Sequence, residues 1–583
     1  MEERENARHI NGTPKQRRIQ ILNTIDNYGF NWKVWAVAAT GFFTDSYNLF
    51  ATNVTLTTLS YIYWKDDKST AHMSIINTVT LSGSIVGQLL FGFLADKFGR
   101  QKLYGIELII VIFTTIGVAQ SSDGVGGSMH IMRWLCAWRF LMGIGIGAEY
   151  PLSSIITAEW APVRSRARMM ASVFIMQPIG QLAALLVGLW VLVGLDRTYG
   201  LQNRGSNDYA STAPIIDTHW RYVTGAGAIP TLVALIFRLT IPESARYTLD
   251  VRGDLDKAER ETETQFSLVE MDFEAGAEHF ETNSIDGNDI EHEERTEQFS
   301  KADLYKYFIA DGNWRYLAGT STTWFVLDIA FYGLGMDNPR TLAKIWSSEP
   351  TSIPEDGIPS WAADARQAQG TIYNALYQNA QRSMLTVSIA SIVGSLLMIK
   401  LIDYVPRKKM LAWSFLWLAV LLGATGVCFI KAFQTNLHGL TIAFYILCQL
   451  SFNLGANTLT FIIPAEIFAT RYRCTCHGIS AAAGKLGSVI IQVIIPTMSF
   501  GRKSIRDPDS NGLGWLLIIF AGVMASGALF AWAWIPDVQN TREGRSLELP
   551  SKKLEELAEG LPRALAEGQV IGFRRRIQGV IRK

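Results

Sequence analysis

The sequence predicts an all-α membrane protein with twelve transmembrane helices, arranged as two pseudo-symmetric six-helix bundles with both termini in the cytoplasm. Three observations predict this fold class: the composition, the spacing of the apolar segments, and a repeat that relates the two halves. Of the 583 residues, 49% are hydrophobic and 18% are charged, whereas soluble domains average about 25% charged residues. The net charge of +1 gives no support to a nucleic-acid partner.

Apolar segments of about 20 residues, the length that spans a bilayer as a helix, recur along the chain. The first six lie near residues 33–58, 73–95, 103–120, 131–157, 168–194 and 221–241. Six more lie near residues 314–335, 383–402, 410–431, 437–463, 475–499 and 513–536. We therefore expect one bundle over 33–241 and a second over 313–536.

Basic clusters fall on alternate loops between these segments. They are KQRR (15–18), KFGRQK (97–102), RSRAR (164–168), RKK (407–409) and RYR (471–473). Because Lys and Arg are retained on the cytoplasmic side of a membrane, these loops are expected to share that side with both tails. The tails are residues 1–32 and 537–583.

The segment between the two halves, 242–312, is acidic. Between residues 250 and 298, seventeen Asp and Glu residues stand against four Lys and Arg residues. A segment of this composition cannot bury enough apolar surface to fold compactly. We expect a cytoplasmic linker with short helices at its ends.

Short motifs recur in the two halves at matching places. GFLADKFGRQK (92–102) follows the second segment, and Asp403 and Arg407 follow the eighth with the same spacing from Asp to Arg. AEWAPVRSR (158–166) follows the fourth segment, and AEIFATRYR (465–473) follows the tenth. Parallel repeats with a site between them near the midplane are typical of alternating-access transporters. A channel or a membrane enzyme would not need this duplication.

An Asp and an Arg at a helix end can pair across helix ends in one conformation and separate in another. We therefore assign candidate conformational gates to Asp96 and Arg100 in the first half, and to Asp403 and Arg407 in the second. A static helix cap is the alternative.

Longer motifs carry a family resemblance. GFLADKFGRQK resembles a signature of the major facilitator superfamily. GIGIGAEYPLSS (143–154), WFVLDIAFYG (324–333) and the stretch 449–487 together resemble the fungal and plant phosphate:proton symporters of that superfamily. The resemblance covers essentially all twelve helices. It implies an importer of inorganic phosphate at the plasma membrane, which works by alternating access with protons as the coupling ion and with no cofactor or metal.

The resemblance also implies roles for particular residues. Those that match the family's phosphate pocket are Tyr150, Gln177, Trp324, Asp328, Tyr332, Asn457 and Lys485. Those that match its proton pathway are Asp45, Arg139 and Glu149, and Asp328 is shared between the two functions. Arg139 and Glu149 are ten residues apart, about 15 Å along a helix, so we expect no direct ion pair between them.

The residue types agree with a site for an anion. Lys485 interrupts an apolar helix, where a lysine costs at least a few kcal/mol, and a cation with neutral donors suits a tetrahedral oxyanion. A sugar would need mainly neutral amides and aromatic rings, so Lys485 argues against a sugar porter. Gln177 occupies nearly the same place in the first half as Lys485 does in the second. We expect both to face one central cavity.

The spacing around Asp328 suits a proton carrier. Trp324, Asp328 and Tyr332 are four residues apart and share one helix face. Burial between two aromatic rings disfavours the charged carboxylate, so such an Asp can take up and release a proton. A structural Asp bonded to a neighbouring helix is the alternative.

Two departures from the family pattern leave the substrate open. Glu149 stands where the family has Asp, and Asn48 stands where it commonly has a second Asp. Glycerophosphodiesters or another organic phosphate are therefore alternative substrates. A receptor that keeps the transporter fold for nutrient sensing is the alternative of another class. No nucleophile–base pair is evident in the predicted helices, so we expect no enzyme, and we expect the chain to act as a monomer.

Overall fold

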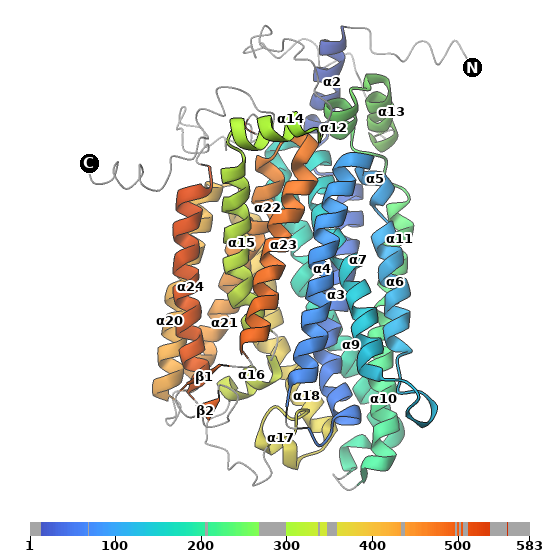
Figure 1. Cartoon of the computed structure of the whole chain (residues 1–583), viewed down its shortest axis with the longest axis vertical. Helices are drawn as coiled ribbons and strands as arrows, with labels where there is room; N and C mark the ends of the chain where they lie inside the picture. The colour runs from blue at the N-terminus through green and yellow to red at the C-terminus, as the bar shows by residue number, and fades with distance from the viewer. Residues whose placement is uncertain are drawn as a thin grey trace.

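Long helical segments that run along one axis form the body of the protein (Figure 1). This computed structural model describes residues 13–67, 69–204, 208–266, 299–335, 338–346, 358–432, 438–495, 498–500, 503–504, 511–536 and 557. The segments of the first half are α3 (Trp32–Tyr63), α4 (Ala71–Phe98), α6 (Ile106–Ala119), α7 (Ile131–Trp160), α8 with α9 (Arg166–Phe174 and Met176–Tyr199), and α10 with α11 (Tyr209–Ala226 and Ala228–Arg238). Those of the second half are α15 (Trp314–Gly335), α18 with α19 (Ile372–Ser383 and Ile389–Leu401), α20 (Arg407–Ala432), α21 with α22 (His438–Leu454 and Ala456–Ile467), α23 (Arg473–Ile494) and α24 (Gly512–Trp534).

These segments lie where the twelve membrane spans were predicted. In the described part of the chain, ten of them are long and apolar enough to cross a membrane. The other two, α3 and α15, are the first helix of each half, and they carry buried polar residues such as Asp45 and Asp328. Their lower apolar content is consistent with helices that face the interior of the bundle rather than lipid. Apolar side chains on other helices, among them Phe113, Trp190 and Trp413, are exposed where lipid would lie.

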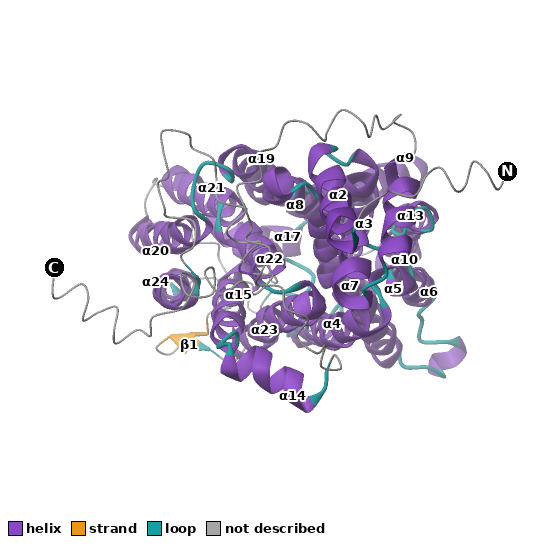
Figure 2. Ribbon diagram, turned by 90° about the horizontal axis from the view of Figure 1, so that it is seen from above, coloured by secondary structure: helices purple, strands orange, loops and turns teal. Residues whose placement is uncertain are grey.

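The two halves pack against each other along matched pairs of helices. Helix α4 of the first half packs on α23 of the second, and α19 of the second packs on α8 of the first. In the view from above, the helices of the first half lie on one side of this interface and those of the second half on the other (Figure 2). The packing of α4 on α23 needs glycine on both helices, because a Cβ on Gly92 would lie 2.8 Å from the carbonyl oxygen of Cys474 and a Cβ on Gly478 would collide with that of Gln88.

The tenth span is broken near its middle, and the break positions a predicted site residue. Helix α21 ends at Leu454 and α22 begins at Ala456, so Gly455 is not helical, with φ −147° and ψ −93°. A side chain at Gly455 would collide with Ser414 on α20. Asn457 lies in the first turn of α22, beside this break. Broken helices beside a central site are a common feature of secondary transporters.

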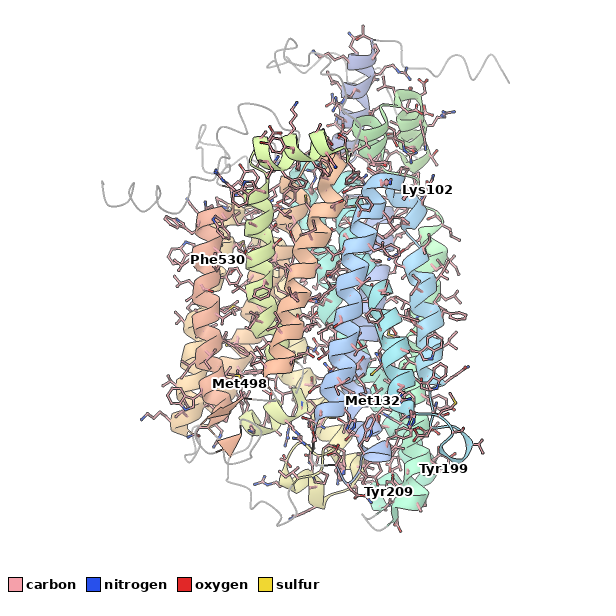
Figure 3. The ribbon with its side chains drawn as sticks, viewed as in Figure 1. Lys102, Met132, Tyr199, Tyr209, Met498 and Phe530 are labelled. Atoms are coloured by element: carbon pink, nitrogen blue, oxygen red, sulfur yellow. The ribbon has the colours of Figure 1, made fainter. Side chains whose placement is uncertain are left out.

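Both ends of the helical body lie together. Helix α2 (Pro14–Asn27) and the C-terminal end of α24 are at the same end of the molecule (Figure 1). Lys102, from a predicted cytoplasmic cluster, lies toward this end, whereas Tyr199 and Tyr209 lie toward the other (Figure 3). This distribution is consistent with the predicted orientation, in which the end that carries α2 is cytoplasmic.

Short helices at the margins of the linker, as predicted, cover the end of the molecule that carries α2. They are α12 (Ala245–Tyr247), the π-helix η5 (Thr248–Arg252), α13 (Leu255–Phe266), α14 (Lys301–Leu304) and the π-helix η6 (Tyr305–Ala310). The acidic centre of the linker, 267–298, lies outside the described residues. Asp250 connects the linker both to α2 and to the second half. It pairs with Arg18 of α2 at 2.9 Å and accepts a hydrogen bond from the Thr470 hydroxyl of the second half at 2.8 Å.

Helix α2 was not predicted within the polar tail 1–32. Thr13 and Gln16 form a capping box and Pro14 opens the helix, a combination that strongly favours a helix start. Arg17 then holds α2 on α13 through Asp256 at 2.6 Å and Glu259 at 2.5 Å. The two acidic partners raise the pKa of Arg17 further above its ordinary value, and the guanidinium stays charged.

The outer loop between α15 and α18 closes over the first half at the opposite end of the molecule. Its described parts include α16 (Asn338–Trp346) and α17 (Ala365–Gln369). The Ser360 amide donates a hydrogen bond to the Asp67 carbonyl at 2.9 Å, and Trp361 packs edge-on against Tyr61 with 5.3 Å between ring centres. A short antiparallel hairpin, β1 (Ser499–Phe500) with β2 (Lys503–Ser504), follows α23 on this side.

Candidate functional site

The ammonium group of Lys485 is bound to α15 in the interior of the bundle. It donates hydrogen bonds to Oδ2 of Asp328 at 3.0 Å and to the hydroxyl of Tyr332 at 2.9 Å. Ser488, one turn further along α23, donates to the same Asp328 oxygen at 3.3 Å. Lys485 is 3% exposed and Asp328 1% exposed. The carboxylate therefore offsets the cost of burying the lysine.

Aromatic rings from both halves surround this pair. The Lys485 nitrogen lies 4.2 Å from the ring centre of Tyr332 and 5.2 Å from that of Tyr150 on α7. Such cation–π contacts are stronger in a desolvated site. Trp324 completes the wall, 6.4 Å from the Tyr150 ring. Gly484 allows this packing, since a Cβ there would lie 2.5 Å from the Trp324 ring.

Amide side chains close the cluster from the first half and from α22. Nε2 of Gln177, on α9, donates to the Tyr150 hydroxyl at 3.3 Å. Nδ2 of Asn457 donates to Oε1 of Gln177 at 3.0 Å and to Oδ1 of Asn453 at 3.2 Å. The structure thus joins the seven predicted pocket residues into one connected cluster, although they come from five helical segments. Their role in binding stays a prediction.

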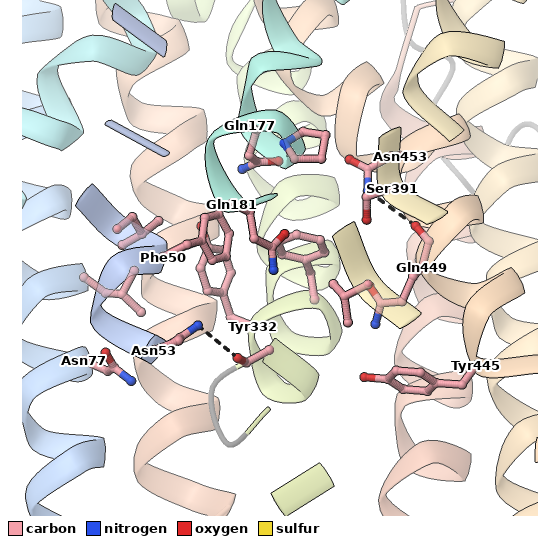
Figure 4. A pocket seen from close by; sticks show the side chains of 16 residues that line it. Phe50, Asn53, Asn77, Gln177, Gln181, Tyr332, Ser391, Tyr445, Gln449 and Asn453 are labelled. Atoms are coloured by element: carbon pink, nitrogen blue, oxygen red, sulfur yellow. Dashed lines mark hydrogen bonds between the residues drawn. The ribbon is translucent and has the colours of Figure 1, made fainter. Parts of the chain in front are cut away.

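A cavity between the two halves adjoins this cluster (Figure 4). Of the seven predicted pocket residues, Gln177 and Tyr332 line it, and the other five lie outside the lining set. Its polar lining residues are Asn53, Asn77, Gln177, Gln181, Tyr332, Ser391, Tyr445, Gln449 and Asn453. Gln177 lines the cavity as expected, whereas Lys485 does not line it and instead donates a hydrogen bond to Tyr332, which does.

A second charged cluster surrounds Glu149. Arg238, at the end of α11, forms ion pairs with both Glu149 and Glu107. The Ser153 hydroxyl also donates to Glu149, and the guanidinium of Arg238 lies 4.0 Å from the ring centre of Tyr104. Arg139 is not part of this cluster, in line with the expected separation of Arg139 and Glu149.

Arg238 and Glu107 were not among the site residues predicted from the sequence. Both lie inside predicted apolar spans, 221–241 and 103–120, and are fully buried. The signal that selected Lys485, a charge inside an apolar helix, would have found them.

Asp45 faces this second cluster without a hydrogen bond. Neither of its carboxylate oxygens has a partner among the described residues. Glu149, Arg238 and Glu107 contribute to the electrostatic field at its carboxyl group. Asp45 and Glu149 are thus brought into one neighbourhood, as expected for residues of one proton pathway.

Arg139 lies apart from these carboxylates. Its guanidinium donates hydrogen bonds to the Thr52 hydroxyl and, at 3.5 Å, to the Asn48 carbonyl oxygen. Within the described part of the chain it forms no ion pair, and its Nε has no hydrogen-bond partner. The contact with Asn48 is through its backbone, and the Asn48 side-chain amide donates to the Thr44 carbonyl oxygen at 3.0 Å.

The first predicted gate joins the two halves at the end of the molecule that carries α2. The Asp96 carboxylate accepts hydrogen bonds from the backbone amides of Thr475 at 2.7 Å and Cys474 at 3.3 Å, at the start of α23. A carboxylate at a helix N-terminus is stabilised by the unpaired amides and the helix dipole. Arg100 pairs with Asp96 at 3.1 Å and donates to the Thr470 carbonyl at 2.6 Å.

The second predicted gate repeats the first with a different partner. Asp403 pairs with Arg168 of the first half at 2.5 Å. Arg407 pairs with Glu466 at 3.3 Å, and Arg100 pairs with Glu159 at 3.1 Å. Both of these pairs span 59 residues, so the internal repeat of the sequence is reproduced in the contacts. Of these contacts, those of Asp96 and Arg100 with residues 470–475 and that of Asp403 with Arg168 join the two halves, and the role of these residues as gates stays a prediction.

Comparison with known proteins establishes the family. Residues 33–325 and 371–545 match the family described as sugar (and other) transporter. The chain is 35% identical over 520 residues to the repressible high-affinity phosphate permease of Neurospora crassa, covering 88% of this chain and 86% of the relative. It is 34% identical over 534 residues to the inorganic phosphate transporter PHO84 of Saccharomyces cerevisiae, covering 90% and 86%.

The fold is also found among solved structures. The proton:xylose symporter XylE of the major facilitator superfamily, bound to 6-bromo-6-deoxy-D-glucose, superimposes with a TM-score of 0.65 at 17% identity, covering 91% of this chain and all of that one. This likeness confirms the predicted all-α fold of that superfamily. Membership of a transporter family also confirms that the chain is not an enzyme. The chain belongs to the sugar (and other) transporter family of the major facilitator superfamily, together with fungal high-affinity phosphate permeases.

Proposed function

We propose that this protein imports inorganic phosphate together with protons, by alternating access, at the plasma membrane. One observation carries the proposal: a buried lysine, Lys485, is held by Asp328 and Tyr332 at the interface of the two halves. The relatives named as phosphate permeases support the same substrate. No cofactor is proposed besides the coupling proton, and the chain is proposed to act as a monomer in the lipid bilayer.

Phosphate binding uses the cluster around Lys485. A tetrahedral oxyanion accepts hydrogen bonds on every side, and the cluster offers an ammonium, two tyrosine hydroxyls and two carboxamides. The ammonium has three N–H donors, of which Asp328 and Tyr332 take two. The third is available to the anion, and the rings of Tyr150 and Tyr332 shield the site from water.

Proton coupling follows from competition for Lys485. An ionised Asp328 satisfies the ammonium and repels a phosphate anion. When Asp328 is protonated, the pair loses its negative charge, and the anion replaces the carboxylate as the partner of Lys485. Loss of the proton toward the cytoplasm restores the pair and expels the anion. The Asp45, Glu149 and Arg238 cluster lies in the first half, where a second proton can be held.

Alternating access requires the cytoplasmic contacts to break. In this conformation Asp96 bonds the start of α23, and Asp403 bonds Arg168 across the interface. A rocking motion of the halves that opens the cytoplasmic end must release both contacts. The same motion exposes the cluster around Lys485 to the cytoplasm, where substrate leaves.

The test is uptake of labelled phosphate by transport-deficient cells that produce the full chain. We expect uptake at acid external pH that an uncoupler abolishes. Lys485→Gln should abolish accumulation, whereas Lys400→Gln, at an exposed lysine of α19, should leave it unchanged. Uptake that is insensitive to the uncoupler contradicts proton coupling. A protein that reaches the membrane but accumulates no phosphate contradicts phosphate import and favours one of the alternatives, an organic phosphate as substrate or a receptor.

A further inference from the structure

A second cavity, here called the outer cavity, lies under the loop between α15 and α18. Arg340 on α16 and Trp361 of the loop line it, together with residues of α3, α4 and α23. Asn53 and Asn77 line both this cavity and the central cavity of Figure 4, so the two adjoin each other. Helices α16 and α17 lie at the end of the molecule opposite α2 (Figure 1). In the predicted orientation, an ion from outside the cell therefore meets the outer cavity first.

The outer cavity carries positive charge. Arg340 is the charged residue of its described lining, which contains no Lys, Asp or Glu. Nη2 of Arg340 donates hydrogen bonds to the carbonyl oxygens of Pro359 at 3.2 Å and of Ser360 at 3.4 Å, and these bonds position the guanidinium beside the loop. A guanidinium has five N–H donors and no acceptor. A cleft lined by positive charge raises the local concentration of anions.

Three buried side chains of the same lining each leave a polar atom unpaired. Nε1 of Trp361, the hydroxyl of Thr70 and Nε2 of Gln492 have no hydrogen-bond partner among the described residues. The three residues are 7%, 2% and 4% exposed, in that order. Oε1 of Gln492 accepts a hydrogen bond from the Thr78 hydroxyl at 3.3 Å, so its amide nitrogen is the atom left to donate. Buried polar groups are nearly always paired with protein, water or ligand.

These groups suit an oxyanion better than any other class of ligand. An indole N–H and a guanidinium only donate hydrogen bonds, and the unpaired atom of Gln492 is a donor as well. A cation would be repelled by Arg340, and an apolar molecule would leave the buried donors unpaired. Phosphate oxygens accept hydrogen bonds, and those from a guanidinium are about twice as strong as hydrogen bonds between neutral groups.

Contacts with the first half hold the loop over the outer cavity. The Ser360 amide donates to the Asp67 carbonyl oxygen at 2.9 Å, and the Ser360 hydroxyl donates to that of Trp64 at 3.2 Å. The ring of Trp361 packs edge-on against Tyr61 with 5.3 Å between ring centres. The indole that carries the unpaired N–H is thus fixed by its packing. Binding of an anion then costs little conformational entropy at this side chain.

We propose that the outer cavity is a second phosphate site, which the anion occupies on its way to the Lys485 cluster. Arg340, Trp361 and Gln492 donate hydrogen bonds to its oxygens. From there the anion passes the two Asn side chains that line both cavities. The proposal rests on the proposed function, because it takes phosphate to be the transported ion.

The first test is the concentration dependence of phosphate uptake by transport-deficient cells that produce the full chain. Trp361→Phe keeps a ring against Tyr61 and removes the N–H donor. Loss of one hydrogen bond to a charged ligand predicts that the phosphate concentration for half-maximal uptake rises about tenfold. The maximal rate should stay the same, because the variant captures the ion less often but leaves the Lys485 cluster intact. Arg340→Gln should raise the half-maximal concentration at least as much.

Two matched variants separate the site from general effects of the loop. Arg366→Gln removes an exposed positive charge from α17 of the same loop, at a residue that does not line the outer cavity. Trp346→Phe removes an indole N–H that already bonds the Thr386 hydroxyl at 3.0 Å, also outside the lining. Both should leave the half-maximal concentration unchanged. Equal effects of Arg366→Gln and Arg340→Gln overturn the site, because the charge of the loop then accounts for the result.

A second readout detects binding without transport. Ala363 lines the outer cavity, and Ala363→Cys combined with Lys485→Gln is labelled on intact cells by a membrane-impermeant maleimide. None of the five native cysteines lines this cavity, so the chain with Lys485→Gln alone gives the background. Phosphate should slow the labelling, whereas chloride at the same ionic strength should not. Adding Trp361→Phe should abolish the protection.

The two readouts distinguish failure of this site from failure of the proposed function. A chain that imports no phosphate, but whose labelling is slowed by phosphate and not by chloride, fails the proposed function and supports the outer site. Phosphate import with an unchanged half-maximal concentration in Trp361→Phe and Arg340→Gln supports the function and overturns the outer site. Labelling that phosphate and chloride affect equally overturns it as well.

Discussion

The Nζ atom of Lys485 lies 3.0 Å from Oδ2 of Asp328, so a buried cation and a buried carboxylate neutralise each other in this conformation. Removing one partner leaves the other charged and unpaired, which costs about 3–5 kcal/mol for a buried pair. We expect Lys485→Met and Asp328→Asn each to lower the midpoint of thermal unfolding in detergent. The double variant should recover most of this loss without recovering phosphate uptake. Additive losses in the double variant would show that the two charges are not coupled.

Arg139 is a buried cation that forms no ion pair with the described residues. An uncompensated buried charge is costly, so Arg139→Gln should stabilise the purified protein by about 1 kcal/mol or more. Uptake should fall in the same variant if the charge is retained for proton movement. Arg133→Gln, at an exposed arginine of the same helix, is the control and should change neither property. Lower stability in Arg139→Gln would mean that the hydrogen bonds of the guanidinium outweigh its burial.

The contact between Asp96 and the start of α23 predicts that replacing Asp96 favours the conformation in which this end of the molecule is open. Asp96→Asn removes the charge that the helix N-terminus stabilises, so the cytoplasmic end should open more often. Cys474, buried at this contact, then becomes accessible. We expect its labelling by a cytoplasmic maleimide to be faster by several fold, and Cys474→Ser identifies the labelled site.

The second gate provides the comparison. Arg168, the partner of Asp403, is 49% exposed at its side chain, and exposed ion pairs contribute little to stability. Asp403→Asn should therefore accelerate the labelling of Cys474 less than Asp96→Asn does. An equal effect of the two variants would contradict the assignment of the Asp96 contact as the stronger gate.

Glu261 on α13 gives a pH dependence outside the membrane. Burial raises its pKa above the ordinary value of 4.5, although the Thr248 hydroxyl donates to it at 2.6 Å. A raised pKa in the folded state means that the folded linker binds the proton more tightly than the unfolded one. The stability of α12 and α13 should therefore fall as pH rises from about 4.5 through the folded pKa.

The neutral variant Glu261→Gln should remove this dependence. A Gln oxygen still accepts the Thr248 hydrogen bond, so the variant should protect the α13 amides better than the native chain at pH 7. At pH 4, where Glu261 is protonated, the two should be alike. Hydrogen exchange of α13 is the measurement. Weaker protection at pH 7 would show that the ion pair with Lys257, at 3.6 Å, outweighs the burial of the carboxylate.

Much of the fold could be predicted from local properties of the chain. The lengths of the apolar runs located the helical segments, and the motifs around Asp96 and Asp403 located the repeat that the pairs Arg100–Glu159 and Arg407–Glu466 reproduce. Helix α2 was missed because its signal is a capping box in a polar segment rather than an apolar run. The break at Gly455 was missed because a single glycine inside an apolar run does not by itself end a helix.

By itself, the sequence indicated that charges near the middle of a span, such as Lys485, are buried, because a charge deep inside an apolar run of membrane length has no access to water. It also determined that Trp324, Asp328 and Tyr332 share a face, because helix periodicity is local. Only the tertiary structure decided which buried charges meet: Lys485 with Asp328, Arg238 with Glu107 and Glu149, and Arg139 with none of the described carboxylates. The physical reason is the short distance over which an ion pair forms. An ion pair requires contact within about 4 Å, and the distance between helices far apart in the chain is set only when their side chains pack.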